Sequence, residues 1–165
     1  ELGAGMAGLA GFAVAMCSSA SEVVLTDGNV ESVENLQQCV DANTSSYGDT
    51  QVSTSVLVWD KNDKMEAHKL RYDVVICADC LFFTEAHDDL MHVLKTMLAP
   101  GGHAIIIAPT RSGTLETFCQ KAQDALVINR EAIVDTAIEQ VHEKALVDSV
   151  TTKYDENLHR PILLN

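Results

Sequence analysis

A glycine-rich segment at the start of the chain is the first place where residue types and spacing could do chemistry. The segment Glu1–Gly8 reads ELGAGMAG, which contains G-x-G-x-x-G just before an apolar stretch of helical length. Glycines there permit a tight turn and let backbone amides approach a ligand closely. About twenty residues later, Asp27 could accept hydrogen bonds from both hydroxyls of a ribose. Together these residues predict a nucleoside-cofactor site, and glycines used only for packing are the less favoured explanation.

Glu1 indicates which nucleoside cofactor this site would prefer. A dinucleotide places its pyrophosphate at the start of the helix, where a nearby carboxylate would repel it. Glu1 stands two residues before Gly3, so its charge suits a ligand with a cationic amino group. S-adenosylmethionine is therefore favoured over a nicotinamide dinucleotide.

Trp59 and Asp60 end a further predicted strand, on the rim where an adenine would lie. The Trp59 ring could cover the adenine face, and the Asp60 carboxylate could accept from the exocyclic amine. A lone tryptophan that closes the edge of the core explains Trp59 about equally well.

Residues 77–83, CADCLFF, follow the next predicted strand. Ligands of open α/β sheets bind at the carboxyl ends of strands, so Asp79 and Phe82 are expected near the reactive end of the cofactor. An aromatic ring at this place can wall a channel for a long amine side chain and attract its cation. Phe83 is better explained as a core residue.

Strand and helix patterns alternate along the chain, which predicts an α/β fold with a mainly parallel sheet and helices on both faces. Pro100-Gly101-Gly102 predicts a chain reversal. No linker or repeat interrupts the pattern, so residues 1–165 are expected to form one domain. The strands are predicted over 22–26, 52–59, 74–77, 104–108, 126–128 and 161–164. The helices are predicted over 6–16, 30–40 with Asn29 as cap, 90–98, 115–125 and 138–145.

The composition excludes several classes of protein. The 24 Asp and Glu residues outnumber the 11 Lys and Arg residues, and the formal charge is −13. Nucleic-acid binding needs clustered Lys and Arg, so this charge argues against it. The apolar share of 47% is typical of a globular domain rather than a disordered chain. No apolar run approaches the roughly 18 residues of a membrane span, so no membrane partner is expected.

The odd number of cysteines argues against a secreted disulfide framework. Cys77 and Cys80 form a lone C-x-x-C, and no second pair or histidine pair completes a zinc site. We therefore expect no metal, and reduced thiols packed as small apolar groups in a cytoplasmic protein, with the nucleus as a further location. The five cysteines are Cys17, Cys39, Cys77, Cys80 and Cys119.

Several of these motifs together resemble those of class I S-adenosylmethionine-dependent methyltransferases. They are ELGAGMAG, LTDGN at 25–29, VWD at 58–60 and LAPGG at 98–102. Residues 78–82, ADCLF, resemble the D-x-x-Y/F signature of the seven-strand protein-lysine methyltransferases, and the calmodulin-lysine branch of that family reads D-C-L-F. The segment 154–164 is also similar to that branch, with Arg160 where an aromatic residue is more usual. The resemblance covers the whole chain and is weakest over 130–150.

The resemblance implies a Rossmann-like class I methyltransferase fold and S-adenosylmethionine as cofactor. It implies transfer of methyl groups to one lysine of calmodulin, ending at trimethyl-lysine. Asp79 and Phe82 would be the catalytic residues, with Phe82 shaping the lysine channel. The cofactor would be bound by Glu1, Gly3, Gly5, Asp27, Trp59, Ala78 and Asp79.

Each of these cofactor residues has an implied contact. Glu1 would lie near the methionyl amino group, with Gly3 and Gly5 against the methionine portion. Asp27 would hold the ribose, and Trp59 would contact the adenine. Ala78 and Asp79 would line the site below the methyl group.

The family pattern also implies a central strand immediately before Glu1, so the chain is expected to be truncated at its N-terminus and to lack the first strand of the fold. Three other functions stay open at this point. The chain could belong to a related lysine methyltransferase with another protein substrate, or to a nicotinamide-dependent oxidoreductase. It could also be a truncated module that only binds a partner.

Overall fold

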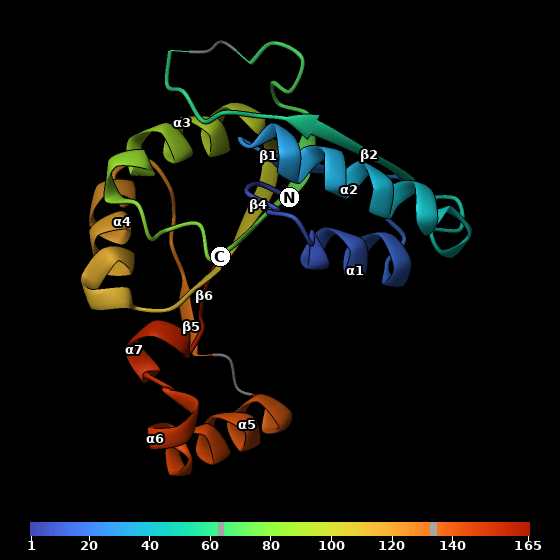
Figure 1. Ribbon diagram of the computed structural model, residues 1–165. Helices are drawn as coiled ribbons and strands as arrows, with labels where there is room; N and C mark the ends of the chain where they lie inside the picture. Colours follow the sequence, from blue (N-terminus) through green and yellow to red (C-terminus); the bar gives the residue numbers. More distant parts are fainter. Residues whose placement is uncertain (63–64, 133–134) are drawn as a thin grey trace.

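The computed structural model describes residues 1–62, 65–132 and 135–165 (Figure 1). The strands are β1 (Glu22–Asp27), β2 (Gln51–Val56), β3 (Tyr72–Ala78), β4 (Leu98–Ala108), β5 (Arg130–Ala132) and β6 (Ile162–Leu164). The helices are α1 (Leu9–Cys17), α2 (Val30–Ala42), α3 (His87–Met97), α4 (Thr114–Ala122), α5 (Thr136–Val147), α6 (Ser149–Thr152) and α7 (Glu156–His159). Short 3₁₀ turns are η1 (Thr44–Ser46), η2 (Thr84–Ala86) and η3 (Arg111–Gly113).

The strands form two hydrogen-bonded groups. In one, β1 pairs with β2 in parallel, from Glu22 opposite Gln51 to Asp27 opposite Val56. The other has the order β3-β4-β6-β5, in which β3 and β4 are parallel and β6 runs antiparallel to both β4 and β5. The α/β class is confirmed, but the sheet is mixed rather than mainly parallel, because the last strand enters in the opposite direction.

The glycine-rich segment joins the two groups of strands. The Leu2 N–H donates to the Ile76 carbonyl of β3 at 2.8 Å, and Ala4 N–H donates to Thr26 of β1 at 2.9 Å. A groove of about 500 Å³ runs beside Glu1 and Leu2 between β1 and β3. The strand expected before Glu1 stays a prediction.

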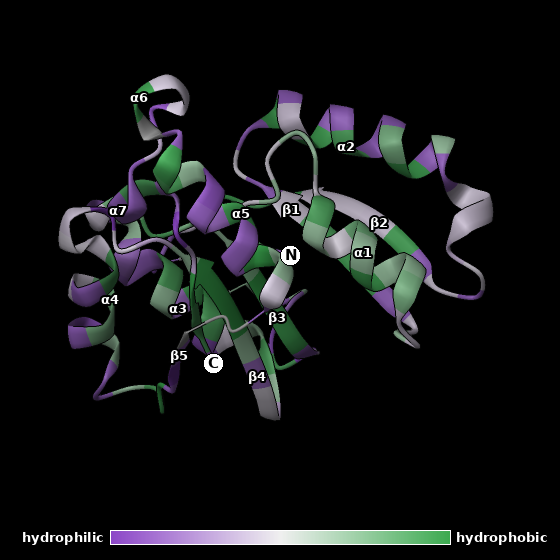
Figure 2. Cartoon of the chain, turned by 90° about the horizontal axis from the view of Figure 1, so that it is seen from below, coloured by the Kyte–Doolittle hydropathy of each residue, from purple (hydrophilic) through white to green (hydrophobic). Residues whose placement is uncertain are grey.

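Two apolar clusters hold the helices to the strands. Phe12 of α1 and Leu36 of α2 pack with Leu25 of β1 in one cluster. In the other, Leu94 of α3 and Phe118 of α4 pack with residues of β3 and β4, which are largely apolar in Figure 2. In Figure 1, α3 and α4 therefore lie on one side of the strands and α1 and α2 on the other. The predicted Asn29 cap of α2 is confirmed, since its side chain accepts from Ser32 N–H.

Three predicted elements differ from the structure. The strand predicted over 126–128 is wrong, because Leu126 N–H instead continues the turn after α4 by donating to Ala122, and the strand forms at 130–132. Strand β2 ends at Val56, which leaves Trp59 in the following loop. The expected reversal at Pro100-Gly101-Gly102 lies inside β4, where the register against β3 shifts.

Within the described ranges, no helix combines the length and the apolar character needed to cross a membrane.

Candidate functional site

The carboxylate of Asp27 holds the glycine-rich turn. Gly3 and Gly5 adopt φ values of 62° and 61°, the left-handed region that glycine enters without strain. The Gly5 N–H donates to Asp27 Oδ2 at 2.8 Å, and Asn29 N–H donates to Oδ1 at 2.9 Å. The structure thus brings the turn and the end of β1 together. Each carboxylate oxygen keeps a lone pair with which to accept from a ligand hydroxyl.

The carboxylate of Glu1 faces the first helix. Its Oε2 accepts from Gly11 N–H of α1 at 2.8 Å. Burial raises the pKa of the Glu1 carboxyl above its usual value, and the hydrogen bond from Gly11 opposes that rise. Glu1 therefore ties the start of the chain to α1, and its expected contact with a methionyl amino group stays a prediction.

The loops after β2 and β3 meet at Gly3. A Cβ on Gly3 would lie 3.0 Å from Cys80 Sγ and 3.3 Å from the Trp59 ring. Trp59 is half-buried and packs against the edge of the larger core cluster. Trp59 therefore closes the edge of the core, as one of its two explanations predicts, and it also borders the glycine turn.

The groups at the turn suit a nucleoside cofactor. At Gly5, an added Cβ would meet none of the described atoms within 4 Å, so the turn is open beside Gly5. The Asp27 carboxylate contacts the turn at Gly5 and the Trp59 ring lies beside Gly3. With the backbone amides, they are the kinds of acceptor, apolar face and donor that a nucleoside site uses.

A second group of residues forms at the end of β3. Ala78, the last residue of this strand, pairs with Ile107 of β4. Asp79 follows with a left-handed φ of 56°, and its carboxylate oxygens lie 2.8 and 3.0 Å from Nη2 of Arg111. The Arg111 guanidinium carbon lies 5.7 Å from the centre of the Phe82 ring. The predicted pair Asp79 and Phe82 therefore shares one cation, supplied by the chain itself.

The aromatic residues after Asp79 correct one sequence prediction. Phe83 is 61% exposed and Phe82 is 44% exposed, so Phe83 is not a core residue. Leu81 occupies the core position instead, and its carbonyl lies 3.0 Å from Nε2 of the buried His87. The two phenylalanine rings lie 4.2 Å apart, outside the core.

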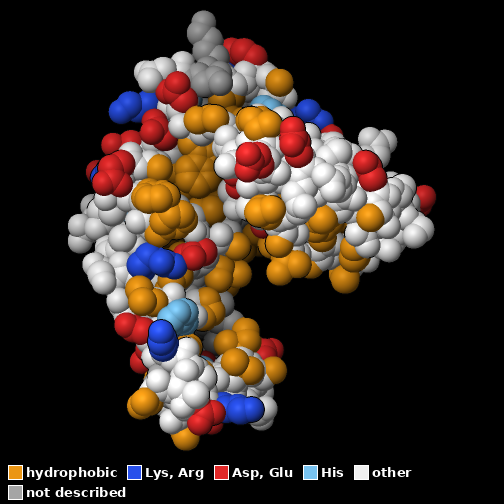
Figure 3. Space-filling view, in the orientation of Figure 1, with side chains coloured by type: hydrophobic (Ala, Val, Ile, Leu, Met, Phe, Trp, Pro, Cys, Tyr) orange, Lys and Arg blue, Asp and Glu red, His pale blue; other side chains and the backbone are white. Residues whose placement is uncertain are grey.

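In Figure 3, apolar side chains gather in the middle of the visible face, with acidic and basic groups beside them. The surface is hollowed between the part that holds α1 and the part that holds α5.

Comparisons with known proteins agree with this arrangement. Residues 1–125 match the family model described as lysine methyltransferase. This chain belongs to that family. A calmodulin-lysine N-methyltransferase from Arabidopsis thaliana is 32% identical over 168 residues, which cover 99% of this chain and 55% of the relative. The chain thus spans about half the length of this curated relative.

Solved structures show the same fold at low identity. One is a complex between the Haloferax volcanii Trm112 methyltransferase activator and a methyltransferase, with a TM-score of 0.64 and 18% identity over 99% of this chain and 78% of that chain. Another is an S-adenosylmethionine-dependent methyltransferase from Mesorhizobium loti, with a TM-score of 0.60 and 14% identity over 99% of this chain and 87% of that chain. The class I methyltransferase fold expected from the motifs is therefore confirmed.

Sequence reasoning missed Arg111 in this lysine methyltransferase family member. Arg111 follows β4 just as Asp79 follows β3, and β3 and β4 are parallel neighbours. The rule that ligands bind at carboxyl ends of strands would have singled it out. The sequence prediction relied on the glycine motif and on carboxylates, and it therefore did not include Arg111.

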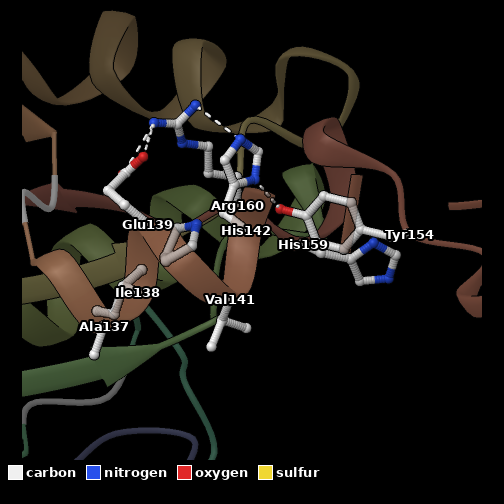
Figure 4. Close-up of a pocket in the computed structure, with 9 residues that line it drawn as sticks. Ala137, Ile138, Glu139, Val141, His142, Tyr154, His159 and Arg160 are labelled. Atoms are coloured by element: carbon white, nitrogen blue, oxygen red, sulfur yellow. Dashed lines mark hydrogen bonds and ion pairs between the residues drawn. The ribbon is translucent and has the colours of Figure 1, made fainter. Parts of the chain in front are cut away.

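Arg160, which stands where the resembling sequences more usually have an aromatic residue, lines a separate pocket of about 290 Å³ beside α5 and α7 (Figure 4). Its guanidinium lies 3.1 Å from Glu139 and 2.8 Å from Glu156. Buried His142 lies 2.7 Å from the Tyr154 hydroxyl through Nδ1. Arg160 thus holds the C-terminal helices together, and none of its described contacts is with a predicted cofactor residue.

The cysteines are free thiols. Cys77 and Cys80 are buried as expected, whereas Cys17 is exposed and is not a core thiol. A hydrogen bond with Cys80, and then burial, raise the pKa of the Cys77 thiol well above its usual value, which disfavours the thiolate that binds metals. Within the described residues, no three His, Cys, Asp or Glu side chains are grouped to hold a metal ion.

Proposed function

We propose that this chain is the methyl-transfer part of an S-adenosylmethionine-dependent protein-lysine N-methyltransferase that acts on calmodulin. One observation carries the proposal. The glycine turn with Asp27 and Trp59 lies at the carboxyl ends of the first strands, and Asp79 with Phe82 lies at the end of the next strand. The proposed nucleoside subsite and the proposed lysine subsite would thus lie at the same edge of the strands.

The residues of the turn would bind the cofactor. The amides around Gly3 and Gly5 would face its methionine portion, and the Asp27 carboxylate would accept from the ribose hydroxyls. Glu1 would stabilise the cationic amino group, Trp59 would cover the adenine, and Ala78 would line the site below the methyl group. When bound, S-adenosylmethionine supplies a methyl group on a positively charged sulfur, which is already activated for transfer.

The protein therefore needs little acid–base chemistry and mainly has to align the lysine nitrogen with the methyl carbon. Holding reactants near attack geometry is worth roughly 7–11 kcal/mol. Lysine must attack as the neutral amine, although its unperturbed pKa is near ~10.4. Burial and a neighbouring positive charge both lower that pKa. In this scheme Asp79 positions the amine, and Phe82 forms the channel wall.

Calmodulin is proposed as the substrate because the residues D-C-L-F and 154–164 resemble the calmodulin-lysine branch, and because the Arabidopsis relative carries that name. Trimethyl-lysine is the proposed end product, and the cytoplasm and nucleus are the proposed locations. The cofactor motifs themselves do not distinguish among protein substrates, so a related lysine methyltransferase with another target is the alternative.

The test is to incubate the full-length protein with methyl-labelled S-adenosylmethionine and calmodulin, and to map the label by mass spectrometry. We expect label on one lysine, up to three methyl groups. A calmodulin variant with that lysine changed to arginine is the matched control and should stay unlabelled. Label in another protein would favour the alternative substrate. Tight binding of a nicotinamide dinucleotide with no methyl transfer would contradict the proposal.

A further inference from the structure

Arg111 lies between the two residues that the proposed function assigns to the substrate lysine. Its Nη2 contacts both carboxylate oxygens of Asp79, at 2.8 and 3.0 Å, and its guanidinium faces the Phe82 ring at 5.7 Å. The Arg111 side chain is only 32% exposed, whereas that of Asp79 is 53% exposed. The carboxylate and the ring are thus more exposed to solvent than the arginine.

Arg111 keeps this position although its backbone is strained and one of its buried N–H groups lacks a hydrogen bond to any described residue. Arg111 and the next residue, Ser112, both have left-handed φ values, 41° and 54°. The Arg111 Nε–H is buried and has no hydrogen-bond partner among the described residues. Strained backbone and unpaired buried donors persist where the surroundings enforce them, and they are frequent at functional sites.

Helix α7 supplies the enforcing contacts. The side-chain oxygen of Asn157 accepts from Ser112 N–H at 2.9 Å and from the Thr110 hydroxyl at 2.7 Å. These bonds clamp the residues on both sides of Arg111. The backbone that carries Arg111 is therefore held in place by α7.

Other ionisable groups lie on the elements around the pair. Among the ionisable groups, only Arg111 is in described contact with the Asp79 side chain. These other groups are Cys77 and Cys80 around the end of β3, Glu85 of η2, His87 at the start of α3, and Asp155, Glu156 and His159 at α7.

This inference rests on the proposed function. A free Asp79 carboxylate beside the substrate would stabilise the ammonium form of lysine, which cannot attack. We propose that Arg111 is a positioning residue that neutralises Asp79, so that the bound lysine loses its proton at a lower pH. The lysine nitrogen releases one proton to water. Its lone pair then forms the N–C bond, while the C–S bond breaks and its electron pair stays on sulfur.

The test is the pH profile of kcat at saturating substrate, because kcat reports ionisations in the enzyme–substrate complex. Arg111→Gln leaves Asp79 uncompensated, so the rising limb of the profile should move to higher pH by about 0.5–1 unit. Asp79→Asn should move it in the opposite direction. The double variant, which removes both charges, should return the limb to the wild-type position.

Two further variants separate charge from structure. Arg111→Lys keeps the positive charge and should keep the wild-type limb. Arg130→Gln removes a surface guanidinium that pairs with Glu116 at 3.1 Å, outside the described contacts of Asp79, and should leave the profile unchanged. Far-UV circular dichroism and thermal unfolding report whether each variant is folded.

The outcomes are distinct. A shifted limb in Arg111→Gln that the double variant restores supports the inference. An unmoved limb with a lower KM would show that Arg111 merely blocks the site, and this result would overturn the inference. An equal loss of kcat in Arg111→Gln and Arg111→Lys would also overturn it. No methyl transfer by the wild-type protein would refute the proposed function and this inference together, whereas transfer with an unmoved limb refutes the inference alone.

Discussion

At the residue scale, the site depends on two carboxylates with different partners. Asp27 accepts two backbone N–H groups, from Gly5 and Asn29. Asp79 instead pairs with the guanidinium of Arg111. The first carboxylate therefore orders a turn and keeps lone pairs for neutral hydroxyls. The charge of the second is already balanced inside the protein. The same side-chain chemistry thus serves two roles, because the neighbouring groups differ.

Asp27→Ala should weaken the binding of S-adenosylmethionine. The variant removes the two proposed ribose hydrogen bonds, each worth about 0.5–1.5 kcal/mol net, and it also frees the Gly5 amide. Calorimetric titration of the full-length protein measures the loss. Asp41→Ala is the control, because its carboxylate accepts only from Gln37 in the described contacts, on the exposed side of α2. An unchanged Kd in a folded Asp27 variant would remove this residue from the site.

Phe82→Ala should impair methyl transfer more than cofactor binding. The ring contributes a face to the cation beside Asp79, and such contacts are worth about 0.5–2 kcal/mol, or about 2–30-fold in rate. Steady-state kinetics and a cofactor titration together separate the two effects. Phe83→Ala is the matched control, since that ring is more exposed and should matter less. A loss of cofactor affinity with transfer intact would contradict the channel role.

At the element scale, α1 must lie very close to β1 for the glycine turn to be in place. A Cβ on Gly11 would lie 2.1 Å from Leu25 Cδ2 and 2.8 Å from Glu1 Oε2. Leu25 is fully buried and has no space to withdraw into. The small residue is therefore required for contact between the helix and the strand, even though glycine is a poor helix former.

Gly11→Ala should destabilise the protein by about 1–3 kcal/mol, because overpacking outweighs the gain of about 1 kcal/mol in helix propensity. Urea unfolding followed by circular dichroism measures the change. Gly101→Ala is the comparison, because its φ is 81° and an added Cβ meets no described atom within 4 Å. It should cost only the backbone strain of about 1–2 kcal/mol. A Gly11 variant as stable as the wild type would refute the close approach.

At the scale of the whole molecule, the formal charge of −13 would oppose the encounter with calmodulin, the proposed substrate, which is acidic. Complex formation must then rely on local contacts rather than on long-range attraction. The four arginines, Arg71, Arg111, Arg130 and Arg160, all pair with carboxylates of the chain itself.

Association with calmodulin should therefore stay unchanged or become faster as ionic strength rises, because salt screens repulsion between like charges. Stopped-flow measurements of the association rate over a salt series test this prediction. A neutral peptide that contains the target lysine is the control and should show little salt dependence. Steep slowing with salt would mean that opposite charges steer the encounter, and it would contradict the prediction.

The sequence by itself determined the order of elements from α1 to α4 and part of the candidate site. The Asn29 cap, the Asp27 position and the glycine turn all depend on local patterns, since cap chemistry and left-handed φ values are properties of a few adjacent residues. For the same reason the α/β class followed from the alternation of short periodic segments. The strand predicted over 126–128 and the core position predicted for Phe83 were both wrong. In each case a short apolar run does not show which of its side chains the rest of the fold will bury.

Only the tertiary structure decided which residues meet across long separations. Asp79 and Arg111 are 32 positions apart, and Asn157 clamps its loop from 45 positions further along the chain than Ser112. The antiparallel entry of β6 likewise depends on where the chain returns after α7. Such contacts follow from the packing of whole elements, which no local pattern encodes. The Asp79 carboxylate was therefore visible in the sequence, whereas its pairing with Arg111 was visible only in the fold.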